Sequence, residues 1–492
     1  MKYPRRETSV CLIITFIALY SVHCSSGRAE QPRAYKPPMG WNSFDSYGVY
    51  LHEEAAMANI AAMAKKLKPY GYEYFVVDNG WFGEYALQEG TIFPAEKHAH
   101  DIQINEYGHF LPSKVYFPNG FEPLVEHCRE HDLKFGVHLM RGIPRKAVEL
   151  NLPIKGTPYT ARDIAITDPD LNCQWCTYCY GVDMDHPGGQ AWYDGLIKHI
   201  AGMGVVFIKY DDIVPYPKEV EGVARAVKSI RKPIILSLSP GGTVDPNAIE
   251  SFRMANMLRV TKDIWDEQKD IDACFDAWRK WQGKEQPGFW IDMDMIPFGQ
   301  LQLMSPPSTD ESKAVMDKGD IALAGKGVHR WSQLSEAQKR TFITMRAMAA
   351  SPLMMGGDLP TLDDHSLSLI TNSDMLACNQ NGVMGSLVFE KNGLEIWKVD
   401  KKEATGTGDA DTGWIGVFNR TDGNEPTEIN KGQLGIETGK KYDLHDVWGE
   451  SSFKPGTIEI EPHNCLFLRY TEEKLSHIHI SEPTRQASIA YA

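Results

Sequence analysis

The chain has 492 residues, of which 42% are hydrophobic and 24% are charged, ordinary values for a globular protein with a large core. This length predicts about two or three domains. The formal net charge of −14 argues against nucleic acid and anionic membrane surfaces as partners, because both favour a basic protein surface. The sequence also contains no basic stripe with interleaved aromatic residues.

The first 29 residues have the pattern of a secretory signal peptide. A basic start precedes the apolar run from Val10 to Val22, which is shorter than a typical membrane span, and small residues follow. An uncleaved signal anchor is the alternative. We therefore expect cleavage between Cys24 and Ala29, and a secreted or extracytoplasmic protein (extracellular, periplasmic or lysosome-like, depending on the host) that has no membrane contact once mature.

Between residues 37 and 358, apolar strand-like runs alternate with amphipathic helix-like segments. Eight such pairs predict a (β/α)8 barrel, assigned to residues 30–381, with catalytic residues at the carboxyl ends of its strands. The long connection from Gly83 to Pro118 is expected to be a lid or a subsite wall. The expected barrel strands are Met39–Phe44, Tyr74–Asp78, Phe135–Leu139, Val206–Asp211, Ile234–Leu238, Met257–Asp263, Phe289–Asp292 and Ser351–Met355.

The pattern of the sequence changes after Asn381. Short β-like runs separated by Gly, Asp and Asn predict a C-terminal antiparallel β-sandwich over residues 382–474. The last segment, residues 475–492, fits neither domain and resembles translated adapter sequence, so we exclude it from the expected fold. A genuine disordered tail is the alternative.

Two carboxylates, Asp211 and Asp263, each follow an apolar run that predicts a buried strand. A charge there opposes the burial preference, so it needs partners or a solvated cleft. With Lys209 and Arg259 nearby in sequence, the pair suggests a retaining glycosidase, in which one carboxylate attacks the anomeric carbon and the other acts as acid and then base. Solvated loop acids, or a helix N-cap at Asp263, are the structural alternatives.

Several ordered motifs support this hypothesis. They are PPMGWNSF (Pro37–Phe44), VVDNGW (Val76–Trp81), IKYD (Ile208–Asp211), RVTKD (Arg259–Asp263), GFWIDMDM (Gly288–Met295) and ASPLMMGGD (Ala350–Asp358). In this order the set resembles glycoside hydrolase family 27, the α-galactosidase-like family that shares a clan with family 36. The resemblance extends from about residue 37 to residue 470.

The resemblance implies a retaining exo-glycosidase that hydrolyses terminal α-D-galactosyl residues of galactosides, oligosaccharides or polysaccharide side chains, with no cofactor and no metal. It makes Asp211 the nucleophile and Asp263 the acid/base. His138 aligns with a position that is often Tyr in the family. The implied substrate-binding residues are Trp41, Asp78, Asn79, His138, Lys209 and Arg259.

Two departures from the family pattern leave the identity of the sugar open. Asn79 stands where the family has a second acid, and Gly80 stands where it has a cysteine, so the usual disulfide at that strand end is absent. An amide offers a donor and an acceptor where a carboxylate only accepts. The same mechanism on a β-L-arabinopyranoside or an isomalto-type α-glucan is one alternative, and a non-catalytic carbohydrate-binding protein on the same fold is another. A metal-dependent barrel hydrolase is disfavoured, because only His138 is well placed as a ligand.

Seven cysteines follow the signal segment, and an odd number in an oxidising compartment leaves at least one without an intrachain partner. We expect disulfide bonds among them. For the cluster at positions 173, 176 and 179, a local disulfide or a plain loop is favoured over zinc, which would need a fourth ligand. The pairing and the oligomeric state, including a homodimer, stay open. The seven are Cys128, Cys173, Cys176, Cys179, Cys274, Cys378 and Cys465.

Overall fold

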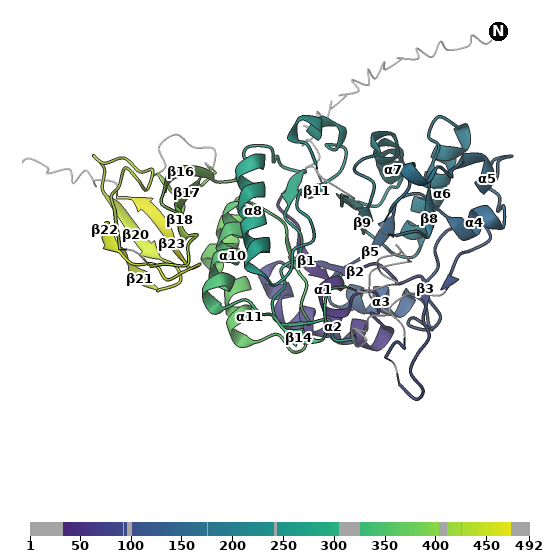
Figure 1. Cartoon of the computed structure of the whole chain (residues 1–492), viewed down its shortest axis with the longest axis horizontal. Coiled ribbons are helices and arrows are strands. Elements are labelled where there is room, and N and C mark those ends of the chain that lie inside the picture. Colours follow the sequence, from purple (N-terminus) through teal and green to yellow (C-terminus); the bar gives the residue numbers. More distant parts are fainter. Residues whose placement is uncertain are drawn as a thin grey trace, which may run out of the picture. The chain divides into compact units, whose positions relative to one another are not determined.

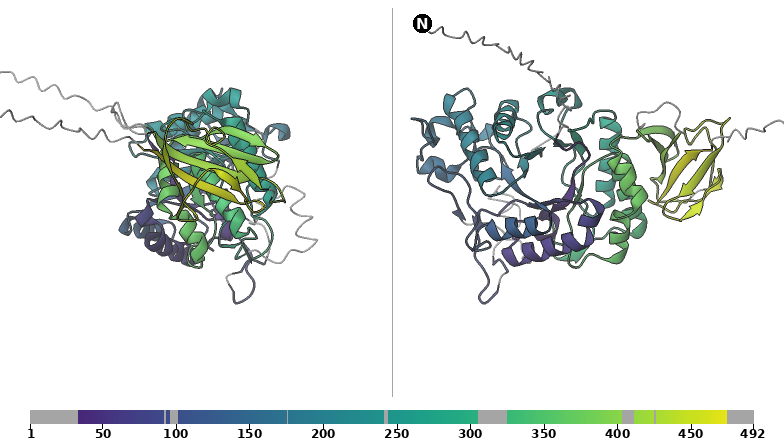
Figure 2. Two further views of the ribbon diagram at one scale, coloured as in Figure 1. Left: turned by 90° about the vertical axis from the view of Figure 1, so that its left-hand side faces the viewer. Right: turned by 180° about the vertical axis from the view of Figure 1, so that it is seen from behind.

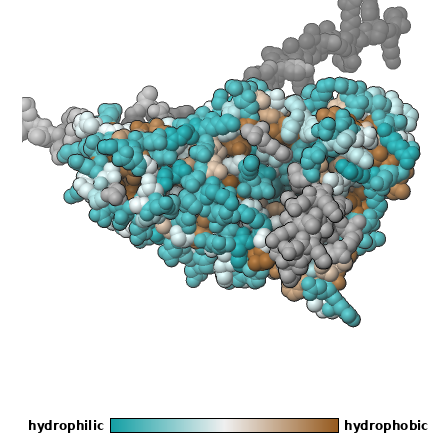
Figure 3. All heavy atoms as spheres, in the orientation of Figure 1, coloured by the Kyte–Doolittle hydropathy of each residue, from teal (hydrophilic) through white to brown (hydrophobic). Residues whose placement is uncertain are grey.

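The computed structural model describes residues 33–91, 93–95, 101–174, 176–240, 244–304, 325–402, 411–424 and 426–473 (Figure 1). The predicted signal peptide and the segment 475–492 lie outside these ranges, so both remain predictions. Within the ranges, no helix combines the length and the apolar character that a membrane crossing requires. Hydrophilic residues cover most of the face seen in Figure 3, in keeping with the net charge of −14.

Eight parallel strands form one curled sheet, in the order β12-β11-β10-β9-β5-β2-β1-β15. A parallel bridge between Ile296 and Met355 joins its two edges, with the Ile296 N–H donating to the Met354 carbonyl at 2.8 Å. Continuous apolar runs form these strands because both faces of the sheet are covered. All eight predicted strands are present: β1 (Met39–Asn42), β2 (Tyr74–Val77), β5 (Lys134–Met140), β9 (Phe207–Asp211), β10 (Ile235–Leu238), β11 (Met257–Arg259), β12 (Trp290–Asp292) and β15 (Leu353–Met355).

Helices surround this sheet (Figure 2). Helix α7 (Pro217–Ser229) shows why they form: a proline opens the first turn, and buried Val220, Val223, Ala224 and Val227 lie on one face at helical spacing. The other helices are α1 (Phe44–Tyr47), α2 (Glu53–Lys66), α3 (Glu122–Glu130), α4 (Arg145–Glu149), α5 (Ala161–Ile164), α6 (Pro187–Gly202), α8 (Gln268–Trp281), α10 (Glu336–Met348), α11 (Asp364–Ile370) and α12 (Ser373–Gln380).

Short strands occur in the connections between the barrel strands. In the described part of the long segment 83–118, the only paired strands are β3 and β4, which form a two-stranded ribbon. The short strands are β3 (Gly83–Glu84), β4 (Asp101–Ile102), β6 (Ile143–Pro144), β7 (Ala165–Ile166), β8 (Cys179–Val182), β13 (Gln300–Leu301) and β14 (Arg330–Trp331).

After α12 the chain forms a six-stranded antiparallel sheet, in the order β16-β17-β18-β23-β20-β21, and a separate ribbon of β19 and β22. The predicted antiparallel character is confirmed. Ile429 of the ribbon shares a hydrophobic core with Ile415 and Leu468 of the sheet. The strands are β16 (Ser386–Lys391), β17 (Leu394–Asp400), β18 (Thr412–Asn419), β19 (Thr427–Ile429), β20 (Tyr442–Asp446), β21 (Ser451–Ser452), β22 (Gly456–Ile458) and β23 (Cys465–Glu472).

The structure does not show the predicted disulfide bonds. The seven cysteines after the signal segment are all described and buried, and none of them forms a disulfide bond. Burial raises the pKa of the Cys176 thiol well above its usual value, so it stays protonated and acts as a small apolar group. Among the residues that the structure describes, no cluster of three or more His, Cys, Asp or Glu side chains is arranged to hold a metal ion.

A fully buried arginine fixes the backbone that follows β12. Arg346 of α10 donates from Nη2 to the carbonyls of Asp294 and Met295, the latter at 3.0 Å, and from Nη1 to Ser351 Oγ at 3.1 Å. Asp294 has a φ of +74°, a left-handed conformation that is strained for a residue with a side chain. The arginine therefore stabilises an otherwise unfavourable turn at the carboxyl end of the seventh barrel strand.

We expect Arg346→Met to lower the free energy of unfolding by about 3 kcal/mol, because it leaves buried carbonyls without their charged donor. Urea denaturation would measure this as a lower midpoint with an unchanged slope. Arg340→Met is the matched control on the same helix. Arg340 is partly exposed and its weak ion pair with Glu336 spans 3.8 Å, so about 1 kcal/mol or less is expected. Equal losses in the two variants would contradict the role of Arg346.

Candidate active site

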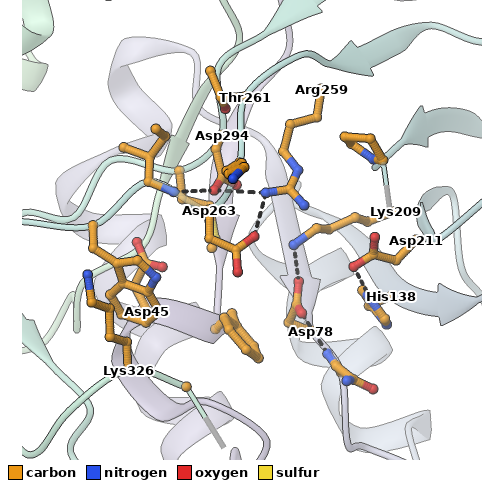
Figure 4. Close-up of a pocket in the computed structure, with 18 residues that line it drawn as sticks. Asp45, Asp78, His138, Lys209, Asp211, Arg259, Thr261, Asp263, Asp294 and Lys326 are labelled. Carbon is orange, nitrogen blue, oxygen red and sulfur yellow. Dashed lines mark hydrogen bonds and ion pairs between the residues drawn. The ribbon is translucent and has the colours of Figure 1, made fainter. Parts of the chain in front are cut away.

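The carboxyl ends of the barrel strands surround a cavity of about 480 Å³ (Figure 4). This volume falls in the range of about 300–1,000 Å³ that is typical of small-molecule sites. Seven of the eight residues predicted from sequence line it: Asp78, Asn79, His138, Lys209, Asp211, Arg259 and Asp263. Trp41 is the exception.

Asp211 is the last residue of β9, and its carboxylate is held at both oxygens. The backbone N–H of Asp212 donates to Oδ1 at 2.8 Å, and Nε2 of His138 lies 3.3 Å from Oδ2. Burial acts to raise the pKa of Asp211, but the hydrogen bond from His138 and the charges of His138, Arg259 and Lys209 outweigh it and hold the pKa below its usual value. The carboxylate is therefore ionised at neutral pH, as a nucleophile requires.

Asp263 lies at the mouth of the cavity. The sequence predicted that Asp263 is the last residue of strand β11. This strand ends at Arg259, however, so Asp263 stands four residues beyond the strand. Its side chain is 60% exposed, and Oδ1 accepts a hydrogen bond of 2.7 Å from Nη1 of Arg259. The N-cap of α8 is Glu267, which excludes the capping alternative for Asp263. An exposed carboxyl can exchange its proton with water and reach a departing group.

Arg259 links three side chains around the cavity. Besides Asp263, its guanidinium donates to Asp294 Oδ2 at 3.2 Å and to Ser239 Oγ at 2.8 Å. Burial acts to lower the pKa of Arg259, but the charges of Asp294, Asp263 and Asp211 outweigh burial and raise this pKa above its usual value. This cation therefore stays charged and compensates the carboxylates around it.

A second buried ion pair lies on the floor of the cavity. Lys209 Nζ donates to Asp78 Oδ2 at 2.9 Å, and Asn42 Nδ2 donates to the same oxygen at 2.6 Å. Burial acts to raise the pKa of Asp78, but the charges of Lys209 and His138 hold it far below its usual range. The direct partner of Lys209 is therefore Asp78, and His138 makes the direct contact with Asp211.

Asn79 and Gly80 have separate structural reasons for departing from the family pattern. The Asn79 side-chain carbonyl accepts a hydrogen bond of 2.8 Å from the buried Tyr178 hydroxyl. Gly80 has a φ of +92°, and a Cβ there would lie 2.4 Å from the Tyr85 hydroxyl and 2.5 Å from Val49 Cβ. Only glycine fits this position, so a cysteine cannot occupy it.

The structure corrects the role of Trp41. This side chain is fully buried, stacks on Phe75 with ring centroids 4.7 Å apart, and donates from Nε1 to the Gly357 carbonyl at 2.8 Å. Trp41 lies inside β1, in the core, whereas Phe44 lies beyond the strand end and lines the cavity. Phe44 belongs to the same PPMGWNSF motif, but only the length of the strand decides which aromatic residue reaches the cavity.

Sequence reasoning also missed Asp45, Asp294, Trp265 and Lys326, all of which line the cavity. Asp294 alternates with apolar residues in the GFWIDMDM motif, and it contacts Arg259 directly. Lys326 comes from a segment without a recognisable motif. No described residue of the long connection 83–118 lines the cavity, so the structure gives no support to the predicted lid.

Comparisons with known proteins show which enzymes the chain is similar to. The chain is similar to the solved structure of a family 27 β-L-arabinopyranosidase from Geobacillus stearothermophilus, with 33% identity, 89% of this chain and 96% of that chain covered, and a TM-score of 0.76. It is also similar to an α-galactosidase from Oryza sativa, 24% identical over 439 residues (87% of this chain, 83% of the relative), and to one from Cyamopsis tetragonoloba, 24% identical over 451 residues (89% and 86%). No protein-family model matches the chain.

We expect Asp211→Asn and Asp263→Asn each to lower turnover of a natural glycoside by about a thousandfold or more, because each removes a group that acts on the reacting bond. Steady-state kinetics would measure this, with circular dichroism to verify folding. Asp185→Asn is the control, since Asp185 is exposed and pairs only with Lys218 on the surface. Normal activity in Asp211→Asn would refute the assignment of the nucleophile.

We expect His138→Ala to move the acid limb of the kcat/KM profile to higher pH. The hydrogen bond from His138 lowers the pKa of Asp211, so its removal raises that pKa and the nucleophile ionises only at higher pH. At neutral pH, kcat/KM should fall about tenfold to a hundredfold. His138→Gln keeps an N–H donor and should shift the limb less. An unchanged acid limb in His138→Ala would show that this contact does not set the ionisation.

Proposed function

The chain belongs to glycoside hydrolase family 27, and from that premise we propose that it is a retaining exo-glycosidase that removes terminal α-D-galactosyl residues. The observation that carries the proposal is the pairing of an ionised, buried Asp211 with an exposed Asp263 in one cavity, with Arg259 in contact with Asp263 and its charge acting on Asp211. A non-catalytic binding protein would not need either feature. The protein is accordingly a glycoside hydrolase.

The first step forms a covalent glycosyl-enzyme. The ionised Asp211 carboxylate attacks the anomeric carbon, the glycosidic C–O bond breaks, and protonated Asp263 gives its proton to the departing oxygen. His138 and the Asp212 N–H hold the attacking carboxylate in place from opposite oxygens. Arg259 adjoins both the developing ester and the acid, so it compensates negative charge as the proton leaves Asp263.

The second step reverses the first with water. Asp263, now a carboxylate, takes a proton from a water molecule, the oxygen of that water attacks the anomeric carbon, and the bond to Asp211 breaks. Two inversions restore the original configuration, so an α-glycoside first releases the α-anomer. The exposure of Asp263 supports this step, because the water must enter from the mouth of the cavity.

The floor of the cavity suits a terminal sugar. Asp78 and Lys209 form an ionised pair that offers both acceptors and donors to hydroxyl groups. Asp78 is 3% exposed and Asp263 is 60% exposed, so the sugar enters a closed floor while its leaving group points to solvent. This asymmetry supports cleavage at a chain end rather than within a chain.

A β-L-arabinopyranoside is the second candidate substrate. The similar solved enzyme from Geobacillus stearothermophilus carries this activity in its name, and a variant of it was solved with arabinose. β-L-Arabinopyranose has the configuration of α-D-galactopyranose at all four shared stereocentres and lacks only the hydroxymethyl group. Asn79 replaces the acid of the family pattern, and its side-chain carbonyl accepts a hydrogen bond from Tyr178. This replacement favours the β-L-arabinopyranoside as substrate.

We also propose that the protein is exported. The proposal rests on the pattern of the first 29 residues, with a basic start, an apolar run and small residues before the expected cleavage point. Export would bring the enzyme to galactosides, oligosaccharides or polysaccharide side chains outside the cytoplasm.

A panel of aryl glycosides tests the substrate. We expect the purified protein to hydrolyse the α-D-galactoside, with NMR showing the α-anomer of the product first. Asn79→Asp should raise the preference for the galactoside over the β-L-arabinopyranoside by about tenfold, because a carboxylate accepts a hydrogen bond from the extra hydroxyl more strongly than an amide does. Asn247→Asp, at an exposed position, is the control.

Three results would count against these proposals. A β-anomer released first from the α-D-galactoside would refute the retaining mechanism. A preference for the arabinopyranoside that Asn79→Asp leaves unchanged would place the choice of sugar elsewhere. No turnover of any glycoside in the panel would refute the activity proposed here.

A further inference from the structure

One carboxyl group on the floor of the cavity has no hydrogen-bond partner among the residues that the structure describes. Asp45 of α1 lines the cavity and is only 1% exposed, and neither of its carboxyl oxygens is hydrogen-bonded. Asp78, Asp211 and Asp294 line the same cavity, and each has hydrogen-bond partners. Figure 4 places Asp45 on the side of the cavity opposite Asp211 and His138.

The fold holds Asp45 in place without using its side chain. Its backbone carbonyl accepts from the backbone N–H of Gln302 at 2.9 Å and from Nε2 of Gln302 at 3.0 Å. Gly356 makes room for the carboxyl group, since a Cβ at that position would lie 2.0 Å from Asp45 Oδ2. A larger residue at 356 would displace the carboxyl group.

A buried polar group without a partner is unfavourable for folding, and such groups are rare in native proteins. Where a buried polar group is retained at a binding site, its natural partner is the ligand. Burial, followed by the charge of Asp294, raises the pKa of Asp45 well above its usual value, although Lys209 acts in the opposite direction. This shift favours the neutral carboxylic acid, which can donate one hydrogen bond and accept others.

We propose that Asp45 hydrogen-bonds a hydroxyl group of the terminal sugar and so helps to determine which sugar the enzyme accepts. This inference rests on the proposed glycosidase function and deepens it. The sugar, rather than the leaving group, is the partner because Asp45 lies on the floor with Asp78, whereas the exposed Asp263 marks the side from which the leaving group departs.

The position of Asp45 indicates which hydroxyl it contacts. The anomeric carbon must lie at Asp211, and Asp45 is on the opposite side of the cavity. The hydroxyls at C3 and C4 are the ones on the far side of a pyranose ring from C1. Asp45 would thus complement Asp78 and Lys209, which supply charged contacts from another part of the floor.

The test combines variants with altered substrates. Asp45→Ala and Asp45→Asn are assayed with the aryl glycoside that the wild-type protein hydrolyses best and with its 2-, 3- and 4-monodeoxy analogues. In the wild type, removing the hydroxyl that meets Asp45 should lower kcat/KM about tenfold or more. In Asp45→Ala, which lacks the partner, the penalty for that analogue should shrink to about threefold or less, with the other two penalties unchanged.

Asp45→Asn keeps a donor and an acceptor at the same place, so it should retain the penalty for that analogue. Both variants should match or exceed the thermal midpoint of the wild type, because each removes a buried carboxyl that has no partner in the protein. A purely structural role would instead lower the midpoint. Asp185→Ala is the surface control.

Two results would overturn the proposal. If Asp45→Ala keeps the wild-type penalty for all three deoxy analogues, Asp45 contacts no sugar hydroxyl. If both variants unfold at lower temperature and lose activity equally on every substrate, Asp45 is structural. Failure of the proposed function would look different, since the wild-type protein itself would then turn over none of the glycosides.

Discussion

Charge compensation by two cations, the partly buried Lys209 and the buried Arg259, underlies the rest of the cavity. Lys209 pairs with Asp78, and Arg259 contacts Asp263 and Asp294 while lowering the pKa of Asp211. Without these cations, several carboxylates in a closed cavity would repel one another and take up protons. A neutral Asp211 could not attack an anomeric carbon, so the proposed chemistry depends on this compensation.

The barrel limits the conformational freedom that these charged groups must lose, because each one lies on a rigid strand or at its end. Lys209 and Asp211 come from β9, Arg259 from β11 and Asp78 from the end of β2, and parallel pairing brings these ends to one face. The buried Arg346 fixes the turn that carries Asp294. Asp45 differs from these groups because its neighbours hold only its backbone, which leaves the carboxyl for a substrate hydroxyl.

Much of the fold could be predicted because the strands are apolar on both faces and evenly interspersed with amphipathic helices. Seven predicted residues meet in the cavity because they lie near the carboxyl ends of the barrel strands, and these ends all face the same side of the barrel. The failures have physical causes. Strand β11 ends at Arg259, which leaves Asp263 on a loop at the mouth, and β1 ends at Asn42, which brings Phe44 rather than Trp41 to the cavity.

The sequence by itself determined the barrel, the two carboxylates proposed as catalytic and the absence of a cysteine at Gly80, because periodicity and ordered motifs are local properties of the chain. Only the tertiary structure decided that His138 contacts Asp211, that Lys209 pairs with Asp78, and that the Asp45 carboxyl has no hydrogen-bond partner among the described residues. Those facts depend on distances between residues far apart in sequence. Burial and charge pairing, which set ionisation states, arise only when distant strand ends are packed into one cavity.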